Sequence, residues 1–519
     1  MATPKILAHP TVADRQAKGA DARDRTPLQS HLGWTPAADR SDPVALLEEQ
    51  NTTREPDLVP VRHGRMAVSP FTFYRGAAKI MAADLAATPT AGLDAQLCGD
   101  AHLSYFGGYA SPERRLVFDL NDFDETLPGP IEYDVKRLAA SFVIAGRNNG
   151  FTPEQSAGAA LAAVRRYRTA MREFAGMGTM ELWYTHLSED DLKAALGRLE
   201  ASAKADPGKG AAGKSASGKG KAGKAGAKAR KDGAKGKDDR TLLEASSDAD
   251  VLARAARRAT KTLDKARTRD SLQALSKLGE EVDGRYRIKS QPPIVVPLRD
   301  FHGIAELAAD NIETVLREQF REYRASLEHD RRHVLENFAY VDMARKVVGV
   351  GSVGTRAFIV LLEGRDMKDP LFLQVKEATR SVLEDHLPAS KFANPGERVV
   401  RGQRMMQATS DIFLGWTKGV QANRFYYWRQ LRDMKTSAVI ESMTPAALSF
   451  YADLCGWTLA RAHARSGDVI AMASYLGDAD TFETALTDFA VRYADQNELD
   501  YQAFTAAIDS GRLPVQRGL

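Results

Sequence analysis

The stretch CGDAHLSYFGGYASPERRLVFDLNDFDE, residues 98–125, concentrates oxygen-bearing side chains around one apolar run, RRLVFDL. Asp100 precedes the run, and the others end it or follow it: Asp119, Asn121, Asp122, Asp124 and Glu125. Carboxylates beside a buried strand are costly unless cations neutralise them, and clustered oxygen ligands suit Mg²⁺. We therefore predict a Mg²⁺ site here, with one aspartate left over to accept a proton from an attacking hydroxyl. The competing interpretation is that Asp and Asn serve only as turn formers.

A second candidate for phosphate chemistry is VVGVGSVGTRAFIVLLEG, residues 347–364, where Gly349, Gly351 and Gly354 have the spacing G-x-G-x-x-G around Ser352. In a dinucleotide-binding unit these glycines open a helix. Here they lead into AFIVLL, a β-branched and aromatic run that ends at the turn EGRD. The pattern predicts strand, glycine turn, strand, turn, strand, which is a hairpin over phosphates as in protein kinases. An ordinary β-hairpin is the alternative.

Lys376 ends the apolar run PLFLQVKEA, 22 residues after Gly354. A lysine among strand apolars is unusual unless its ammonium meets an anion, although it can also snorkel at the strand's end. A kinase-like site needs such a lysine and a carboxylate on a helix to hold it. We expect this carboxylate to be Glu397, with Glu384 as the alternative.

Other polar residues give weaker signals. His102 lies beside Asp100, and we expect it to order the loop rather than to ligate a metal. Arg62, Arg65 and Arg75 are candidates for an anionic substrate pocket, although arginines on a helix and its approach are more often surface or ion-paired residues.

One further motif is rejected. Gly208–Ser215 satisfies G-x-x-x-x-G-K-[ST], but it lies in a tract, Lys204–Asp239, made almost only of Lys, Ala, Gly, Ser and Asp. A working P-loop needs a buried strand before it and a helix after it. Such a composition predicts a disordered, solvated insertion. Nonspecific contact with nucleic acid is the less favoured interpretation, and we expect no specific nucleic-acid binding.

Length and composition limit the number of domains, the disulfides and the membrane segments that the chain can have. The 519 residues are enough for two or three domains, and two cysteines, Cys98 and Cys455, cannot build a disulfide framework. No signal peptide is recognisable, and no apolar run is long enough to span a membrane. We expect a cytoplasmic protein with no membrane partner. The net charge of +4 does not by itself imply nucleic acid.

The elements that must position these residues divide the chain into six predicted regions. The expected fold class is α+β, mostly helical, with one small antiparallel sheet. The regions are an extended arm (1–60), a helical part with the acidic loops (61–202), the disordered insertion (203–240), a helical region (241–340), a small β-region with the glycines and Lys376 (341–437), and C-terminal helices (438–519).

The segments GDAHLSYFG, VFDLNDFDE and GPIEYDVKRLA resemble the H-G-D-x-H-x-x-N, D-[FW]-x-[DE] and Y-D-L-A pattern of the aminoglycoside phosphotransferase and choline kinase group. The resemblance implies that Asp100 is catalytic, with His102 beside it. It implies that Asp122 binds metal, because Asp122 precedes Asp134 by twelve residues as in that group, and that Asp134 is structural. One position departs from the pattern. Tyr105 stands where the group has a metal-binding asparagine, for which Asn121 or Asp124 is the candidate substitute.

Most of the chain more closely resembles an uncharacterised bacterial family, domain of unknown function 2252, on the segments RHGRMAVSPFTFYRGAA, CGDAHLS, FDLNDFDETLPGP, GVGSVGTR, QVKEA and GQRMMQATSDIFLGW. The aspartates precede the glycine loop, the reverse of a kinase, so we expect a circularly permuted, bilobal kinase-like fold. The function these resemblances imply is transfer of phosphate from ATP, with Mg²⁺, to an unknown small-molecule or protein hydroxyl. The alternatives are a non-catalytic nucleotide-binding scaffold and adenylyl transfer.

Overall fold

The computed structural model describes residues 9–205, 257, 260–261, 263–265, 271–300, 312–420, 423–431 and 434–518. The chain divides into two units, the larger made of Met1–Glu189 and Leu263–Leu519 and the smaller of Asp190–Thr262. Helix α9 (Glu189–Ala205) is the element described in the smaller unit. The predicted disordered insertion, from residue 206 onward, and the rejected motif Gly208–Ser215 lie outside the described residues.

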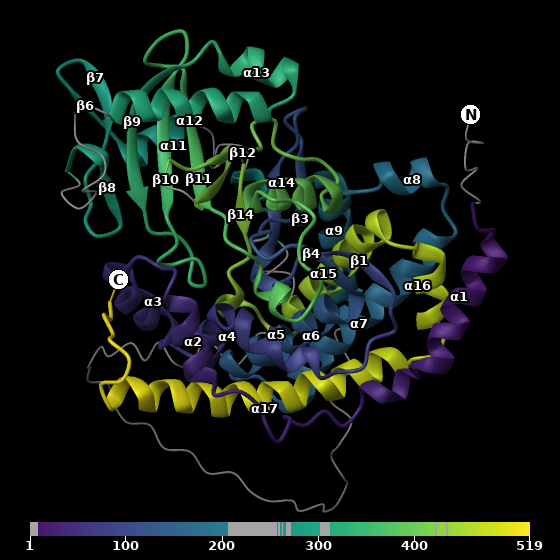
Figure 1. Ribbon diagram of the computed structural model, residues 1–519. Coiled ribbons are helices and arrows are strands. Elements are labelled where there is room, and N and C mark those ends of the chain that lie inside the picture. Colours follow the sequence, from purple (N-terminus) through teal and green to yellow (C-terminus); the bar gives the residue numbers. More distant parts are fainter. Residues whose placement is uncertain are drawn as a thin grey trace, which may run out of the picture. The chain divides into compact units, whose positions relative to one another are not determined.

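An antiparallel sheet of six strands carries both the glycine motif and Lys376 (Figure 1). Its order is β12-β13-β11-β10-β9-β8, and each neighbouring pair is antiparallel. The strands are β8 (Val295–Pro297), β9 (Ala339–Lys346), β10 (Ala357–Glu363), β11 (Pro370–Glu377), β12 (Gly415–Lys418) and β13 (Phe425–Gln430). The predicted order of strand, glycine turn, strand, turn, strand is confirmed by β9, β10 and β11.

Helices cover this sheet, and for that reason the run AFIVLL is apolar at every position. Side chains alternate between the two faces of a strand, so a continuous apolar run needs two covered faces. Val360 and Leu362 of β10 pack with Tyr323 in one cluster, and Ile359 and Leu361 pack with α11 residues in the other. The helices of this part are α11 (Ser271–Leu278), α12 (Ile312–Ser326), α13 (His329–Leu335) and α14 (Pro395–Met406).

The rest of the larger unit is mainly helical. Its helices are α1 (Val12–Arg25), α2 (Pro43–Asn51), α3 (Val59–Met66), α4 (Pro70–Gly76), α5 (Ala78–Ala86), α6 (Ile131–Asn148), α7 (Pro153–Ala175), α8 (Thr179–Tyr184), α15 (Pro445–Ser466), α16 (Val469–Leu476) and α17 (Thr481–Asp509). Short 3₁₀ turns are η1 (Leu28–His31), η2 (Pro56–Leu58), η3 (Leu103–Tyr105), η4 (Leu298–Asp300), η6 (Val382–Asp385) and η7 (Ile440–Ser442).

Helix α6 is the centre of this helical part, with a continuous buried stretch from Ile131 to Gly146, and it packs on α7 and α17. Helix α15 crosses α7 closely, because a Cβ added to Gly456 would lie 2.1 Å from the Ala163 carbonyl oxygen. Pro153 and Pro445 occupy the first turns of α7 and α15, and the hydroxyls of Thr152 and Thr444 cap them.

The prediction of a single sheet is wrong. Besides the six-stranded sheet, the described residues form a four-stranded sheet of order β14-β2-β3-β5 and two pairs, β1-β4 and β6-β7. These strands are β1 (Asp94–Leu97), β2 (Phe106–Ala110), β3 (Leu116–Leu120), β4 (Leu127–Pro130), β5 (Leu187–Ser188), β6 (Gly279–Val282), β7 (Arg285–Ile288) and β14 (Thr436–Ser437). The strands β6, β7 and β8 also correct the helical region predicted for residues 241–340.

The prediction of an extended arm over residues 1–60 is also wrong for the described part, which forms α1, α2 and two 3₁₀ turns. Helix α1 buries only small residues, Gly19 and Ala22, against α16, so the sequence shows no apolar stripe there. Helix α2 inserts Val44 and Leu47 into a cluster with residues of α17. The N-terminal segment is therefore part of the larger unit's core.

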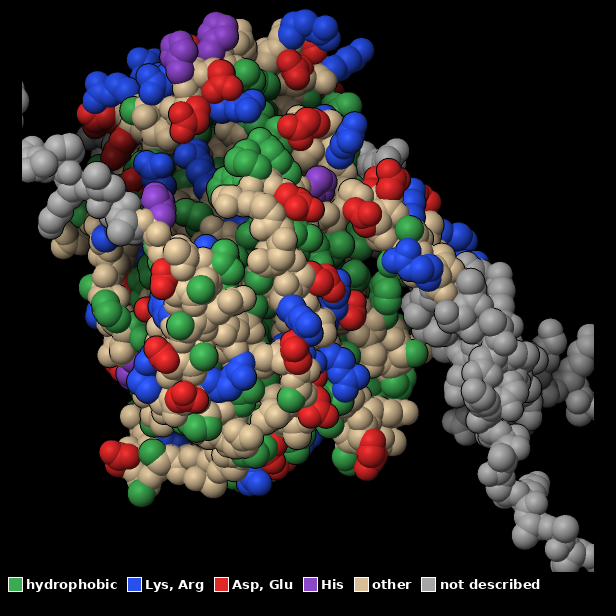
Figure 2. All heavy atoms as spheres, turned by 90° about the vertical axis from the view of Figure 1, so that its right-hand side faces the viewer, with side chains coloured by type: hydrophobic (Ala, Val, Ile, Leu, Met, Phe, Trp, Pro, Cys, Tyr) green, Lys and Arg blue, Asp and Glu red, His purple; other side chains and the backbone are tan. Residues whose placement is uncertain are grey.

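Among the described residues, no helix is both long and apolar enough to cross a membrane. On the face seen in Figure 2, basic and acidic side chains intermingle over the described surface. That face therefore lacks the continuous basic stripe that a nucleic-acid backbone needs.

Candidate functional site

The loop between β9 and β10 has the conformation that its glycines allow. Gly349 and Gly354 have φ angles of 68° and 90°, which side chains with a Cβ rarely adopt. Gly351 lies against helix α4, since an added Cβ would be 2.9 Å from the Arg75 carbonyl oxygen. A strand, β10, follows the loop, so it is a hairpin and not a Rossmann turn.

The N-terminal segment holds this loop in place, a role that no sequence pattern indicated. The Glu55 backbone N–H donates to the Gly354 carbonyl at 2.7 Å, and Nη1 of Arg65 donates to the Gly349 carbonyl at 2.6 Å. Val353 packs in a small cluster with Leu58 and neighbouring residues. The partners lie almost 300 residues apart in sequence, so only the tertiary structure brings them together.

Lys376 meets the acidic loop that follows β3. Its side chain lies on β11 and is buried, and its Nζ is 2.5 Å from Oδ2 of Asp124 and 3.7 Å from Oδ2 of Asp122. Burial opposes the ammonium charge, but Asp122 and Asp124 outweigh it and hold the pKa of Lys376 above its ordinary value. The prediction that Lys376 meets an anion is confirmed, and the two predicted halves of the site face one another.

Both carboxylate oxygens of Asp124 accept hydrogen bonds from Lys376 and the residues around it. Its Oδ1 accepts from the Tyr427 hydroxyl at 2.7 Å, and its Oδ2 accepts from Lys376 and from Oγ of Ser352 at 3.4 Å. Burial raises the pKa of Asp124, but the charge and hydrogen bond of Lys376 and the other donors lower it below its ordinary value. The glycine loop, the lysine strand and the acidic loop thus converge on one carboxylate.

The expected pair between Lys376 and Glu397 is wrong. Glu397 pairs with Arg401 on its own helix at 3.3 Å. The next residue, Arg398, is the one that faces inward: it is buried and donates to the carbonyl oxygens of Asp124, Thr126 and Thr379. One helical residue corresponds to a rotation of about 100°, so a one-residue difference decides which charge enters the core. The alternative partner, Glu384, is near Arg398 and not near Lys376.

Asp100 is buried beside Arg137, whose Nη2 lies 2.7 Å from Oδ1 of Asp100. Burial raises the pKa of Asp100 to about 6, although Arg137 and Tyr105 oppose the shift. The loop before it is fixed by Asp134, which accepts from the backbone N–H groups of Cys98 at 2.6 Å and Gly99 at 2.9 Å. Asp134 therefore stabilises the loop that presents Asp100.

His102 and Tyr105 complete this loop. The His102 ring is buried, accepts at Nδ1 from the Ser104 backbone N–H, and lies 4.0 Å from the Tyr105 ring centroid to centroid. These contacts fit a residue that orders the loop. Burial, followed by the charges of Asp100 and Asp122, raises the pKa of Tyr105 well above its ordinary value, so the phenol stays protonated at the position where the resembled group has its asparagine.

The side chain of Asp119, one of the predicted metal ligands, has other partners. Oδ1 of Asp119 accepts from Nη2 of Arg461 at 2.6 Å and Oδ2 accepts from the Ala408 backbone N–H at 2.9 Å, so both oxygens are engaged away from Lys376. Asn121 is held through its backbone, whose N–H donates to the Tyr105 carbonyl and whose carbonyl accepts from Arg429, so its side chain stays a predicted ligand. Asp119 is thus paired with a cation from α15, and its role as a metal ligand stays a prediction.

Asp122 and Asp124 fit Mg²⁺ only where waters and substrate oxygens supply the rest of its coordination shell. Within the described ranges, no group of three or more His, Cys, Asp or Glu side chains is arranged to hold a metal. Mg²⁺ commonly takes one or two carboxylates and completes its shell with waters and substrate phosphates. Asp122 and Asp124 match that smaller requirement, and they do not form an all-protein cage.

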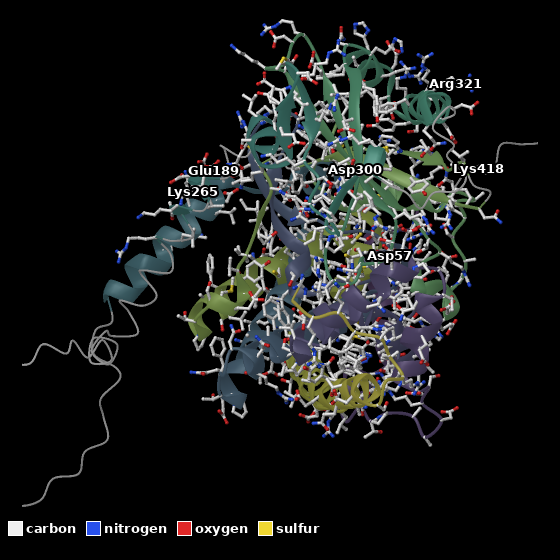
Figure 3. All side chains as sticks on the ribbon, turned by 90° about the vertical axis from the view of Figure 1, so that its left-hand side faces the viewer. Asp57, Glu189, Lys265, Asp300, Arg321 and Lys418 are labelled. Atoms are coloured by element: carbon white, nitrogen blue, oxygen red, sulfur yellow. The ribbon has the colours of Figure 1, made fainter. Side chains whose placement is uncertain are left out.

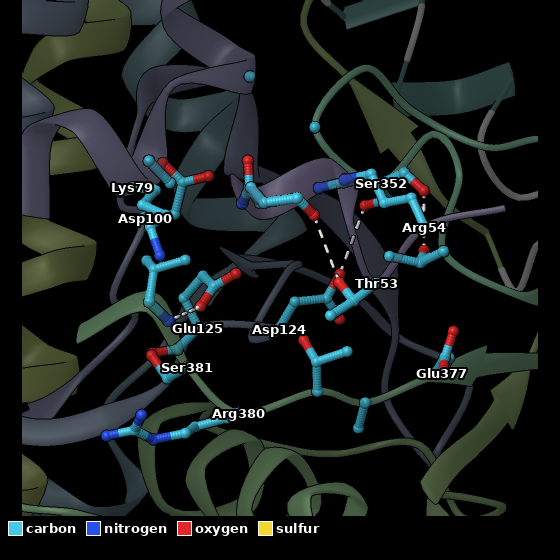
Figure 4. Close-up of a pocket in the computed structure, with 18 of the residues that line it drawn as sticks. Thr53, Arg54, Lys79, Asp100, Asp124, Glu125, Ser352, Glu377, Arg380 and Ser381 are labelled. Atoms are coloured by element: carbon cyan, nitrogen blue, oxygen red, sulfur yellow. Dashed lines mark hydrogen bonds between the residues drawn. The ribbon is translucent and has the colours of Figure 1, made fainter. Parts of the chain in front are cut away.

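A cavity of about 290 Å³ opens beside these groups (Figure 4). Asp100, Tyr105, Asp124 and Glu125 line it together with Gly351 and Ser352 of the glycine loop. Residues that sequence reasoning did not select complete the wall: Thr53, Arg54, Lys79, Glu377, Arg380 and Ser381. No spacing rule links them to the acidic loop, because they come from the residues after α2, from α5, and from the end of β11 and the residues after it.

Glu125 gives a first testable prediction. Burial raises the pKa of Glu125 to about 7 from 4.5, so its neutral form stabilises the fold below pH 4.5 and this contribution is lost as the pH rises through 7. Glu125→Gln keeps an acceptor for the Val382 backbone N–H. We expect the variant to be more stable than wild type at pH 8, by on the order of 3 kcal/mol, and equal to it at pH 4.5.

The measurement is denaturant unfolding of both proteins between pH 4.5 and 8. Glu363→Gln, at the end of β10, is the matched control, and its difference from wild type should not change with pH. A constant difference between Glu125→Gln and wild type across this range would show that the pKa of Glu125 is the same in the folded and unfolded protein.

The comparison with known families assigns the chain to one of them. The family described as "Uncharacterized protein conserved in bacteria (DUF2252)" matches residues 54–225 and 224–507, and the chain belongs to that family. The matched ranges include the acidic loops, the glycine loop and Lys376. No curated protein and no solved structure matches the chain.

Proposed function

We propose that this protein binds ATP with Mg²⁺ and transfers a phosphate to a hydroxyl acceptor from a circularly permuted kinase-like site. One observation carries the proposal: a glycine-looped hairpin, a buried strand lysine and an acidic loop, with Lys376 and Asp124 252 residues apart in sequence, meet at one place. Phosphoryl transfer depends on positioning and charge neutralisation, and these are the parts that such a site uses.

The order of the elements supports the permuted arrangement. From β9 the chain runs through the glycine loop, β10, β11 with Lys376, α14, β12 and β13. This is the order in which a kinase places its glycine loop, lysine strand and regulatory helix. The acidic loops lie upstream, after β3 and before η3, yet they reach the same cavity.

Each residue has a defined task in this proposal. Lys376 holds the inner phosphates, with Gly349, Gly351, Ser352 and Gly354 above them, and the phosphates displace Asp124 from the ammonium. Asp122 and Asp124 hold Mg²⁺, which when bound neutralises phosphate charge. Asp100 accepts the proton of the acceptor hydroxyl, and Arg137 keeps its carboxylate in position.

A second candidate, a nucleotide-binding scaffold without efficient transfer, is favoured by Tyr105. Its phenol lies among Asp100, Asp122 and Asp124, where the resembled kinases have an amide ligand. A protonated phenol is a poor Mg²⁺ ligand at neutral pH. This candidate predicts nucleotide binding without turnover.

The deciding experiment measures thermal stability with MgATP. Wild type should be stabilised in a concentration-dependent way, by about 2.7 kcal/mol when ATP is at a hundredfold excess over its dissociation constant. Asp122→Asn should lose most of this gain when Mg²⁺ is present and little when it is absent. Asp330→Asn, on the surface helix α13, is the matched control and should behave as wild type.

Product identity then separates the chemistries. Release of ADP supports phosphoryl transfer, whereas release of pyrophosphate supports adenylyl transfer from the same site. Stabilisation by MgATP with neither product supports the scaffold. No stabilisation by MgATP in wild type would refute the proposal.

A further inference from the structure

Two arginines that line the cavity, Arg54 and Arg75, each have a donor atom without a hydrogen-bond partner among the described residues. Arg54 follows α2, and only 8% of its surface is exposed. Arg75 lies in α4 and is half-buried. Nη1 of Arg54 donates to the Val353 carbonyl of the glycine loop, and the Arg75 guanidinium lies 5.9 Å from the Phe71 ring centroid. The Nε atoms of both arginines are buried and have no hydrogen-bond partner among the described residues.

The acids of the same cavity are matched by other groups. The pairs are Asp100 with Arg137, Asp124 with Lys376, Glu377 with Arg356 and Arg424, and Asp385 with Lys79 and Arg380. Glu125 accepts from the Val382 backbone N–H. Arg54 lies close enough to Glu125 and Asp124 to be influenced by them, yet burial still lowers the pKa of Arg54 to about 10. The pairing therefore leaves two guanidinium groups without a carboxylate.

We propose that Arg54 and Arg75 form an anion subsite in this cavity and that it takes a phosphate group. Guanidinium groups match the oxygens of phosphate with paired hydrogen bonds, and a buried site strengthens them. Oγ of Ser352 lines the same cavity, and Figure 4 shows Arg54 and Ser352 next to each other on one side of it. The identity of the anion as phosphate rests on the proposed function. The presence of two arginines without a carboxylate partner is independent of that function.

The phosphate has two possible sources that share this chemistry. It is either the outermost phosphate of the nucleotide or a phosphate that the acceptor already carries. Both place a dianion beside the acidic loop, with Arg54 and Arg75 supplying the compensating charge.

The test is calorimetric titration of inorganic phosphate into the full-length protein without nucleotide. Wild type should bind phosphate, and Arg75→Gln should weaken binding at least tenfold. Arg75→Lys, which keeps the charge without the paired donors, should lie between them. Arg54→Gln should weaken binding similarly, provided that its thermal midpoint shows a folded protein. Arg321→Gln, at the outer surface of α12 (Figure 3), is the control and should bind as wild type.

A second titration distinguishes the sources. If the subsite holds the outermost nucleotide phosphate, bound MgATP blocks inorganic phosphate and bound MgADP does not. If it holds the acceptor's phosphate, inorganic phosphate binds in the presence of either nucleotide. Both results support the subsite.

Two results overturn it: no phosphate binding by wild type, or equal binding by wild type, Arg75→Gln and Arg54→Gln. If phosphate binds through these arginines but MgATP does not bind, the proposed function fails and the anion subsite stands. If MgATP binding depends on Asp122 but phosphate binding does not depend on the arginines, the subsite fails and the proposed function stands.

Discussion

Asp100→Asn should reduce turnover of ATP by about 10²–10⁴-fold while MgATP binding stays within about twofold of wild type. The amide has nearly the shape of the carboxylate, so the loop held by Asp134 should persist. The amide, unlike the carboxylate, cannot accept the proton of an attacking hydroxyl at neutral pH. ADP release, with water as the acceptor, measures turnover, and the thermal shift with MgATP measures binding.

The pH dependence of turnover tests the same assignment. Asp100 must be ionised to act as a base, and its pKa of about 6 predicts that wild-type turnover rises through pH 6. Asp330→Asn should keep both the rate and its pH profile. Turnover by Asp100→Asn at the wild-type rate would remove the role given to Asp100, and a loss of MgATP binding would show that the variant has disturbed the site itself.

Lys376→Met should lower the free energy of unfolding by about 3–5 kcal/mol and abolish stabilisation by MgATP. The substitution leaves Asp122 and Asp124 without the cation that neutralises them, and removing one partner of a buried ion pair is strongly destabilising. Lys418→Met, at the exposed end of β12 (Figure 3), is the matched control and should change stability by less than about 0.5 kcal/mol.

A double variant distinguishes the stability lost with the charge of Lys376 from the stability lost with its packing. Lys376→Met with Asp124→Asn removes both charges of the closer pair, so it should regain a large part of the stability that Lys376→Met alone loses. The deficit of Lys376→Met should also shrink as the pH falls below 4, because Asp124 gains from Lys376 only while it is ionised. Equal instability of the single and double variants at every pH would mean that Lys376 acts through packing alone.

The sequence by itself determined the local parts. Turn residues and continuous β-branched and aromatic runs placed β9, β10 and β11 around Gly349 and Gly354, because hairpin geometry depends on neighbouring residues. A lone lysine in an apolar strand predicted that Lys376 meets an anion, since a buried ammonium without one is too costly. The sequence did not identify that anion: Glu397 was the expected partner, and Asp124 is the observed one.

Only the tertiary structure decided which of these residues work together. Asp119 belongs to the same cluster as Asp122, yet it lies on β3 and binds Arg461, whereas Asp122 lies in the loop after β3 and faces Lys376. Glu397 and Arg398 are adjacent, and the rotation of α14 brings the arginine inward. No motif selected Arg54, and Arg75 was only a weak candidate for an anionic pocket, but the packing of the chain from α2 to α4 places both at the cavity. Contacts between residues some 300 positions apart depend on how the helices pack, and no local spacing encodes them.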